Sequence, residues 1–166
     1  MLKKIVFFAF LFISAGAIAQ EIKIAYLNSS EVITAMPEFL QMQDTLQKTK
    51  DAIDAELKIL EDEYNKKYTA FMAESETLVE SIRIRRLQEI QDIEQRAQTF
   101  NQQSQQTLQQ LQQNLFVPIQ QKVKDTIEAV GAENNFTYVV DAATLLYISP
   151  QSIDATPLVK KKLGLN

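Results

Sequence analysis

The chain has 166 residues and contains no cysteine and no histidine, which excludes disulfides, thiolate metal ligands and Ser-His catalytic pairs. Its three glycines lie at positions 16, 131 and 164, so the sequence holds no glycine-rich phosphate-binding loop. The net charge of −4 disfavours nucleic acid as a partner. We therefore predict a protein that is not an enzyme and that carries no cofactor and no metal.

The first nineteen residues have the order of a cleavable signal peptide. Lys3 and Lys4 precede an apolar run over residues 5–13, and small residues follow up to Ala19. The apolar run is shorter than the roughly 20 residues of a membrane-spanning helix, although an uncleaved anchor is the alternative. We expect export with cleavage after Ala19, which leaves 15 basic and 21 acidic residues, a net charge of −6.

Three segments are rich in β-branched and aromatic residues and are separated by turn-forming residues. They read IKIAYLN, FTYVVDA and LLYIS, at residues 22–28, 136–142 and 145–149. All three lie outside the central part of the chain. We predict that they form three short strands of one small sheet.

The central part is predicted to be long helix, because residues 38–117 contain no glycine or proline and are dominated by strong helix formers. Apolar and small side chains recur there in steps of three and four, which predicts a narrow coiled-coil seam. The predicted seam comprises Phe39, Met42, Leu46, Thr49, Ile53, Leu57, Leu60, Tyr64, Tyr68, Phe71, Ser75, Leu78 and Ile82.

We predict that this helical region folds back as a hairpin. One unbroken helix would span about 120 Å and would hold the first strand away from the other two. Pro37 and Pro118 flank the region, and their midpoint at 77.5 places the turn near Thr77-Leu78. The sequence TLVE over 77–80 resembles a capping box that opens the second helix. The alternative is an unbroken helix that completes its sheet by exchange with another chain.

The predicted arm is charged over most of its length and uncharged only in the later part of its returning half. Acidic residues precede basic ones by four positions five times, as Asp44-Lys48, Asp54-Lys58, Asp62-Lys66, Glu63-Lys67 and Asp92-Arg96, which favours ion pairs along each helix. Residues 97–121 carry no charge, and 101–114 are mostly glutamine. This stretch suits an arm that stays helical and soluble without closing tightly, or it is a solvated helix of low complexity. Its expected seam positions are Phe100, Ser104, Thr107, Leu108, Leu111 and Leu115.

Four apolar residues near the turn are candidates for contact with a binding partner: Phe71, Met72, Leu78 and Val79. Methionine and other apolar side chains on an adaptable surface suit promiscuous binding. Phe71 and Leu78 can equally serve as seam residues, so Met72 and Val79 are the stronger candidates.

These elements predict an α+β fold that is mostly α, with a long antiparallel helical hairpin on a small β-sheet body. The expected body comprises residues 20–36 and 117–166, and the expected arm comprises 37–116 with its tip near 74–81. A body of three short strands leaves apolar surface uncovered, so we expect oligomerisation.

The strand KIAYLNSSEVI, the long Gln/Glu/Lys hairpin and the segment YVVDAATLLYISPQSIDATPLVKKKL together resemble the Skp/OmpH family of periplasmic chaperones. The resemblance implies a jellyfish-like homotrimer whose helical arms enclose a cavity. It also implies ATP-independent holding of unfolded outer-membrane β-barrel proteins in the periplasm, without stable membrane insertion. Familiar members are strongly basic whereas this chain is acidic, so we assign no basic lipid-binding site.

Two other functions are compatible with parts of the sequence. A structural coiled-coil spacer of the cell envelope would need the same arms but no binding surface. An enzyme that uses only carboxylates would need a concave site, and Asp141 at the end of a strand is a candidate. We expect instead that Asp141 binds the amide groups of a turn.

Overall fold

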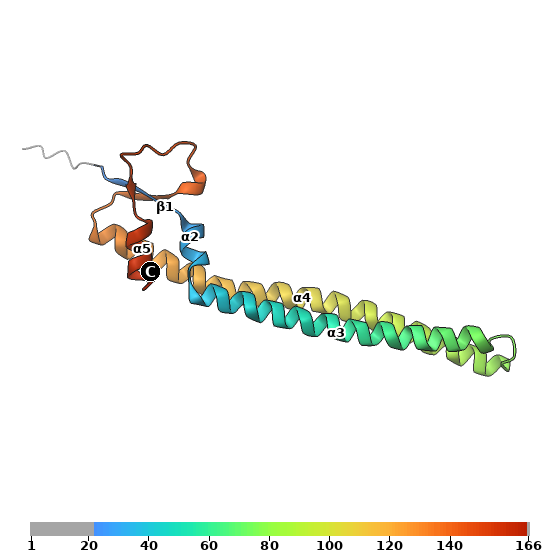
Figure 1. Ribbon diagram of the computed structural model, residues 1–166. Coiled ribbons are helices and arrows are strands. Elements are labelled where there is room, and N and C mark those ends of the chain that lie inside the picture. The colour runs from blue at the N-terminus through green and yellow to red at the C-terminus, as the bar shows by residue number, and fades with distance from the viewer. Residues whose placement is uncertain (1–21, 166) are drawn as a thin grey trace, which may run out of the picture.

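The computed structural model describes residues 22–165, and a single long helical hairpin extends from a small body (Figure 1). The predicted signal peptide and its cleavage site lie outside these residues. The predicted α+β, mostly helical fold with a hairpin on a small sheet is confirmed. The elements in chain order are β1 (Ile24–Leu27), α2 (Ser29–Thr34), α3 (Pro37–Glu74), α4 (Glu80–Glu133), β2 (Tyr138–Asp141), the 3-10 helix η3 (Ala142–Thr144), β3 (Ile153–Asp154) and α5 (Thr156–Lys162).

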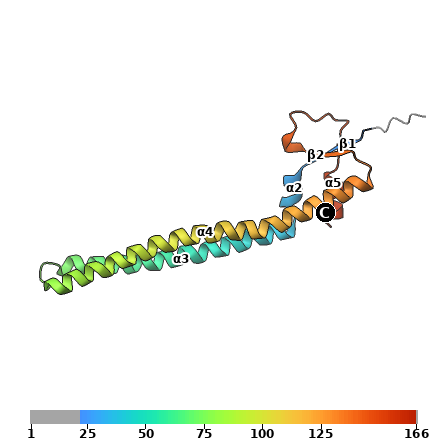
Figure 2. The ribbon, with the colours of Figure 1, turned by 180° about the vertical axis from the view of Figure 1, so that it is seen from behind.

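Helices α3 and α4 run antiparallel and side by side over the length of the arm (Figures 1 and 2). Pro37 lies in the first turn of α3, where its missing N–H removes no helical hydrogen bond. At the base of the arm the rings of Phe39 and Phe116 meet edge-on at 6.5 Å. These two residues are equally distant from position 77.5, so the hairpin has the register that the two prolines predict.

The seam of the hairpin is narrow. Met42, Leu60 and Phe71 of α3 are buried, and Ile90 and Ile93 are buried on α4. The α3 part of the predicted stripe therefore faces α4, except that Tyr68 is exposed, and Ile82, the last member of the stripe, is exposed on α4. Further along α4, Ser104 is the buried seam residue of the glutamine-rich stretch, where Thr107 is exposed. The seam is consequently more polar in that stretch than near the tip.

The body contains a three-stranded sheet in the order β2-β1-β3, and all its pairings are parallel. The first two predicted strands are confirmed. The third prediction is wrong, because residues 145–149 form no strand and β3 lies at Ile153–Asp154. A strand parallel to its neighbours can begin only after the chain has crossed back along the sheet. Residues 142–152 make that return, so the strand-like sequence LLYIS falls in the connection.

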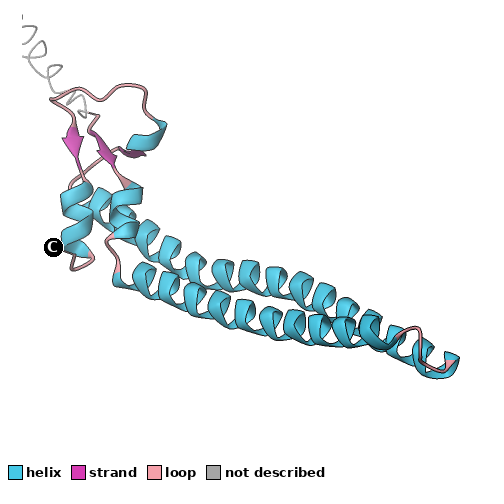
Figure 3. Ribbon diagram, turned by 45° about the vertical axis from the view of Figure 1, so that its right-hand side comes forward, coloured by secondary structure: helices cyan, strands magenta, loops and turns pink. Residues whose placement is uncertain are grey.

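One face of the sheet packs against helices. Ala25 and Leu27 of β1 are buried, and Leu27 packs in a core with Val32 of α2, Val130 of α4 and Val159 of α5. Ile24 of β1 and its register partner Tyr138 of β2 alternate onto the other face and are exposed. Figure 3 shows the helices gathered on one side of the strands. The second face of the sheet is thus apolar and uncovered in the single chain.

Candidate functional site

The exposed apolar side chains of the arm are concentrated near its tip. We call residues 57–98 the outer arm and residues 41–56 with 99–116 the middle arm. No large apolar side chain of the middle arm is exposed, although the structure describes both of its segments completely. The outer arm exposes seven such side chains, namely Ile59, Tyr68, Met72, Val79, Ile82, Ile84 and Leu87.

The four candidate contact residues divide into two pairs. Phe71 is buried in the seam, and Leu78 is half-buried in the turn between the helices. Met72 and Val79 are 57% and 66% exposed. The helical period explains the difference between Phe71 and Met72, because adjacent positions of a helix point about 100° apart. Met72 and Val79 are therefore the two that a partner can reach.

The tip is closed by the turn over residues 75–79, and the predicted capping box is wrong. Val79, not Thr77, precedes the first residue of α4, and no side chain caps that end of the helix. The Thr77 hydroxyl instead donates to the Glu74 carbonyl at 2.9 Å, as the Thr77 amide does at 3.0 Å. Thr77 thus donates hydrogen bonds at the end of α3, where carbonyl groups have no partner within the helix. The Val79 side chain cannot cap the helix, and it is exposed on the surface.

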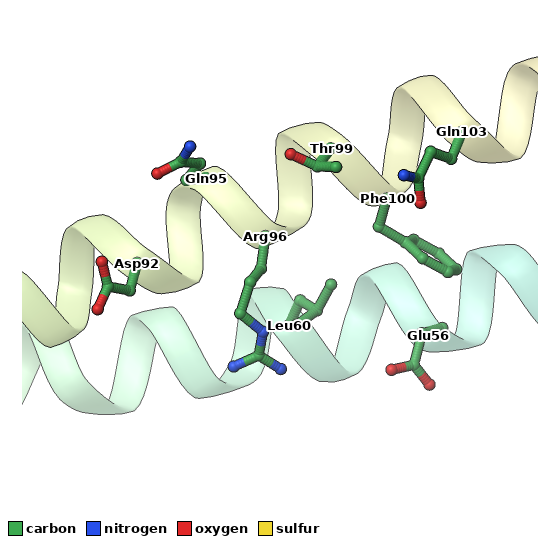
Figure 4. A pocket seen from close by; sticks show the side chains of 8 residues that line it. All are labelled: Glu56, Leu60, Asp92, Gln95, Arg96, Thr99, Phe100 and Gln103. Carbon is green, nitrogen blue, oxygen red and sulfur yellow. The ribbon is translucent and has the colours of Figure 1, made fainter.

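Two grooves flank the seam at the level of Leu60, which lines both. Figure 4 shows the first groove, of about 640 Å³, with Arg96 and Phe100 reaching over Leu60. It is lined by Glu56, Leu60, Asp92, Gln95, Arg96, Thr99, Phe100 and Gln103. The second groove, of about 490 Å³, is lined by Leu57, Leu60, Glu61, Tyr64, Ile93, Glu94, Ala97, Gln98 and Asn101.

A pair of stacked tyrosines lies beside the second groove. The rings of Tyr64 and Tyr68 are 5.8 Å apart and nearly parallel, with an interplanar angle of 8°. The sequence pattern placed both rings in the seam, but Tyr68 lies at its edge and is exposed. Residues spaced alternately three and four apart average 3.5 per turn, whereas a straight helix has 3.6, so such a stripe gradually rotates around the helix. This rotation could have indicated that Tyr68 lies at the edge of the seam.

Ion pairs cross from one helix of the arm to the other. Lys67 binds Glu89 at 2.8 Å and Arg86 binds Glu74 at 2.6 Å, both in the outer arm. Of the five pairs predicted along single helices, only Asp44-Lys48 forms, at 2.7 Å. Glu63, Lys67 and Arg96 pair across the seam instead, whereas Lys58 pairs with Asp62 on its own helix at 3.6 Å. Arg96 accordingly lies 3.7 Å from Glu63, and Lys122 binds Glu38 at the arm base.

These ion pairs perturb two carboxyl groups. The Lys67 ammonium, by its hydrogen bond and its charge, lowers the pKa of Glu89 below 4.5. The hydrogen bond from Lys122 likewise lowers the pKa of Glu38. Both glutamates are therefore ionised at neutral pH and hold the two helices together at the outer arm and at the base.

The aspartates of the body accept hydrogen bonds from backbone amides in its turns. Asp141 accepts a hydrogen bond from the Ala143 amide at 3.0 Å and another from the Ser29 hydroxyl. Asp154 accepts from the Thr156 amide at 2.8 Å, at the start of α5. Burial and the nearby Asp154 raise the pKa of Tyr26. The expectation that Asp141 binds turn amides is thus confirmed, and both carboxylates have structural partners.

Within residues 22–165, no three histidine, cysteine, aspartate or glutamate side chains converge as a metal site would require. None of the described helices combines the length and the apolar character needed to cross a bilayer.

Comparisons with known proteins identify the fold and the family. The crystal structure of a candidate OmpH-like outer membrane chaperone from Caulobacter crescentus matches with a TM-score of 0.76 at 15% sequence identity, over 86% of this chain and 83% of that one. No curated relative matches at a significant level. The model of the family described as "Outer membrane protein (OmpH-like)" matches residues 23–163. Because this match covers most of the chain, the protein belongs to the OmpH-like family.

Proposed function

We propose that the protein is an ATP-independent holdase chaperone of the periplasm that binds unfolded outer-membrane β-barrel proteins. The observation that carries the proposal is the contrast within the arm, whose outer part exposes seven large apolar side chains while its middle part exposes none. Membership of the OmpH-like family supports a chaperone role. The three glycines are far apart in the sequence and do not make up a phosphate-binding loop, so the holding of clients should not depend on ATP.

We further propose that the body assembles as a homotrimer. Ile24 and Tyr138 leave the second face of the sheet apolar and exposed, and in the neighbouring connection Leu146 is fully exposed and Tyr147 is largely exposed. Exposed apolar patches of this kind typically mark protein interfaces. Further copies of the chain would cover this face, and the number three follows the family resemblance. Three arms on one body would enclose a cavity for the client.

The test of function is suppression of aggregation. A barrel protein diluted from denaturant should scatter less light in the presence of the chaperone, and equally so with and without ATP. Light scattering of the chaperone alone should give about three chains per particle, and its intact mass should lack residues 1–19. A strict requirement for ATP, or no suppression, would contradict the holdase function, whereas a monomer would remove the cavity.

A structural spacer of the envelope is the alternative. A spacer needs an arm of fixed length but gains nothing from Met72 and Val79 in solvent. The same aggregation assay separates the two functions, because a spacer should leave the barrel protein to aggregate.

A further inference from the structure

The two grooves beside Leu60, at the boundary of the outer and middle arms, differ in charge although they lie at the same height. Glu61 of α3 and Glu94 of α4 are on the rim of the second groove, whose lining contains no basic side chain. The first groove contains Arg96, which lies 3.7 Å from Glu63. We call the second groove the acidic groove and the first the mixed groove.

The two glutamates of the acidic groove have no ionic partner. Neither Glu61 nor Glu94 forms an ion pair with any residue among 22–165, although eleven other ion pairs are present there. Both side chains are exposed, so they are hydrated carboxylates on either side of an apolar floor made by Leu57, Leu60 and Ile93. This arrangement leaves negative potential over an apolar surface.

Apolar and aromatic side chains of α3 extend from the acidic groove toward the tip. Tyr64 lines the groove, Tyr68 stacks on Tyr64, and Met72 follows four residues later on the same side of α3. From Leu57 to Met72 the helix rises about 22 Å, which an extended chain spans in about seven residues. Aromatic faces beside carboxylates also favour cations, since a lysine or arginine can lie over the ring.

We propose that the acidic groove binds an extended segment of an unfolded protein in which a lysine or arginine lies between apolar or aromatic side chains. This inference rests on the proposed holdase function and specifies which segments the arm selects. The apolar side chains would pack on the half-buried Leu57 and Tyr64, while the basic group would reach Glu61 or Glu94. A segment with an acidic residue at the same place would be repelled by both glutamates.

Binding of three labelled eight-residue peptides to the full chain tests this inference. The peptides alternate leucine and tyrosine with small polar residues and differ only at one central position, which is lysine, glutamine or glutamate. Fluorescence anisotropy at low salt should rank them lysine, glutamine, glutamate, with about two- to fivefold tighter binding for lysine than for glutamine. Added salt should reduce the lysine preference because the rim carboxylates are exposed.

Two matched double variants test whether the acidic groove causes the preference for the lysine peptide. E61Q with E94Q should abolish the advantage of the lysine peptide over the glutamine peptide. E56Q with D92N removes the same number of charges at the same height of the arm, but from the mixed groove, and should keep that advantage. All four positions are exposed, so both variants should fold, as circular dichroism can verify.

The outcomes separate this inference from the holdase function. If the chain keeps an unfolded barrel protein soluble but binds the three peptides equally, or binds none of them, the inference is overturned while the function stands. The same holds if both double variants lose the preference alike. If E61Q with E94Q changes the number of chains per particle, the groove contacts another copy of the chain and the inference is again wrong. If no barrel protein is held at all, the function itself fails.

Discussion

The outer arm and the middle arm are made of the same two helices but differ in their seams and surfaces. The outer seam buries Leu60, Phe71 and Ile93, and ion pairs such as Lys67–Glu89 cross it. The middle seam buries Met42 near the base and Ser104 further out, and its returning helix is uncharged and rich in glutamine. The outer arm is thus both better cross-linked and richer in exposed apolar side chains. Because the buried seam and the ion pairs hold the two helices together, the outer arm can keep apolar side chains exposed without packing them between its helices.

Shortening the arm is the strongest test of this comparison. Deleting residues 57–98 removes 42 residues, 21 from each helix, so three heptads leave each side and the seam stays in register. The body should still fold and assemble by circular dichroism and light scattering. Holding of an unfolded barrel protein should be mostly lost.

A complementary deletion provides the control. Removing residues 43–56 together with 99–112 takes two heptads from each helix of the middle arm and leaves the outer arm intact. This variant should keep most of its holding activity. If both deletions were equally active, the arm would be a spacer and the structural alternative would be preferred.

The seam should respond unequally to truncation of its side chains. L60A removes a buried leucine from the outer seam and should lower the free energy of unfolding by about 2–4 kcal/mol, because it leaves a cavity. S104A should change it by no more than about 0.5 kcal/mol, in the stabilising direction, because alanine is the better helix former. Thermal unfolding followed by circular dichroism measures both. A larger loss for S104A would show that the middle seam depends on its buried hydroxyl.

The exposed tip side chains should matter for binding and not for folding. Met72→Ser with Val79→Ser should weaken holding about three- to fivefold with little change in melting temperature, because these side chains are outside the seam. Leu40→Ser with Val117→Ser is the matched control at the arm base, where the two side chains are 56% and 60% exposed against 57% and 66% at the tip. Equal losses of holding from both variants would mean that exposure alone, and not position on the arm, governs binding.

Removal of an ion pair should have the smallest effect on stability, and the direction of the pKa shifts determines how this effect changes with pH. Glu38 and Glu89 have lowered pKa values in the folded chain, so each stabilises the fold above its unfolded pKa and loses that contribution as pH falls through the folded one. E38Q and E89Q should each lower the melting temperature slightly at neutral pH, and the effect should fade as the pH drops through the lowered pKa values, because a protonated carboxyl group no longer forms the ion pair. A difference that persists in acid would point to packing instead of charge.

The sequence by itself determined the hairpin. Residues 38–117 contain no glycine or proline, and Pro37 and Pro118 flank them, so the local chain set the start of α3 and the place of the turn, although α4 continues through Pro118 to Glu133. The strand composition of residues 22–28 and 136–142 likewise identified β1 and β2. The division of the tip residues into Phe71 and Leu78 against Met72 and Val79 followed from the helical period.

Only the tertiary structure decided which segments and charges meet. LLYIS has a strand's composition, but the parallel order β2-β1-β3 makes it a connection and gives the third strand to Ile153–Asp154. Lys67 was expected to pair with Glu63 on its own helix and pairs instead with Glu89 on the other. The acidic groove likewise arises only when Glu61 and Glu94 are placed on either side of one seam. Pairings between distant segments depend on how two surfaces are oriented, and the local pattern of one segment carries no information about the other.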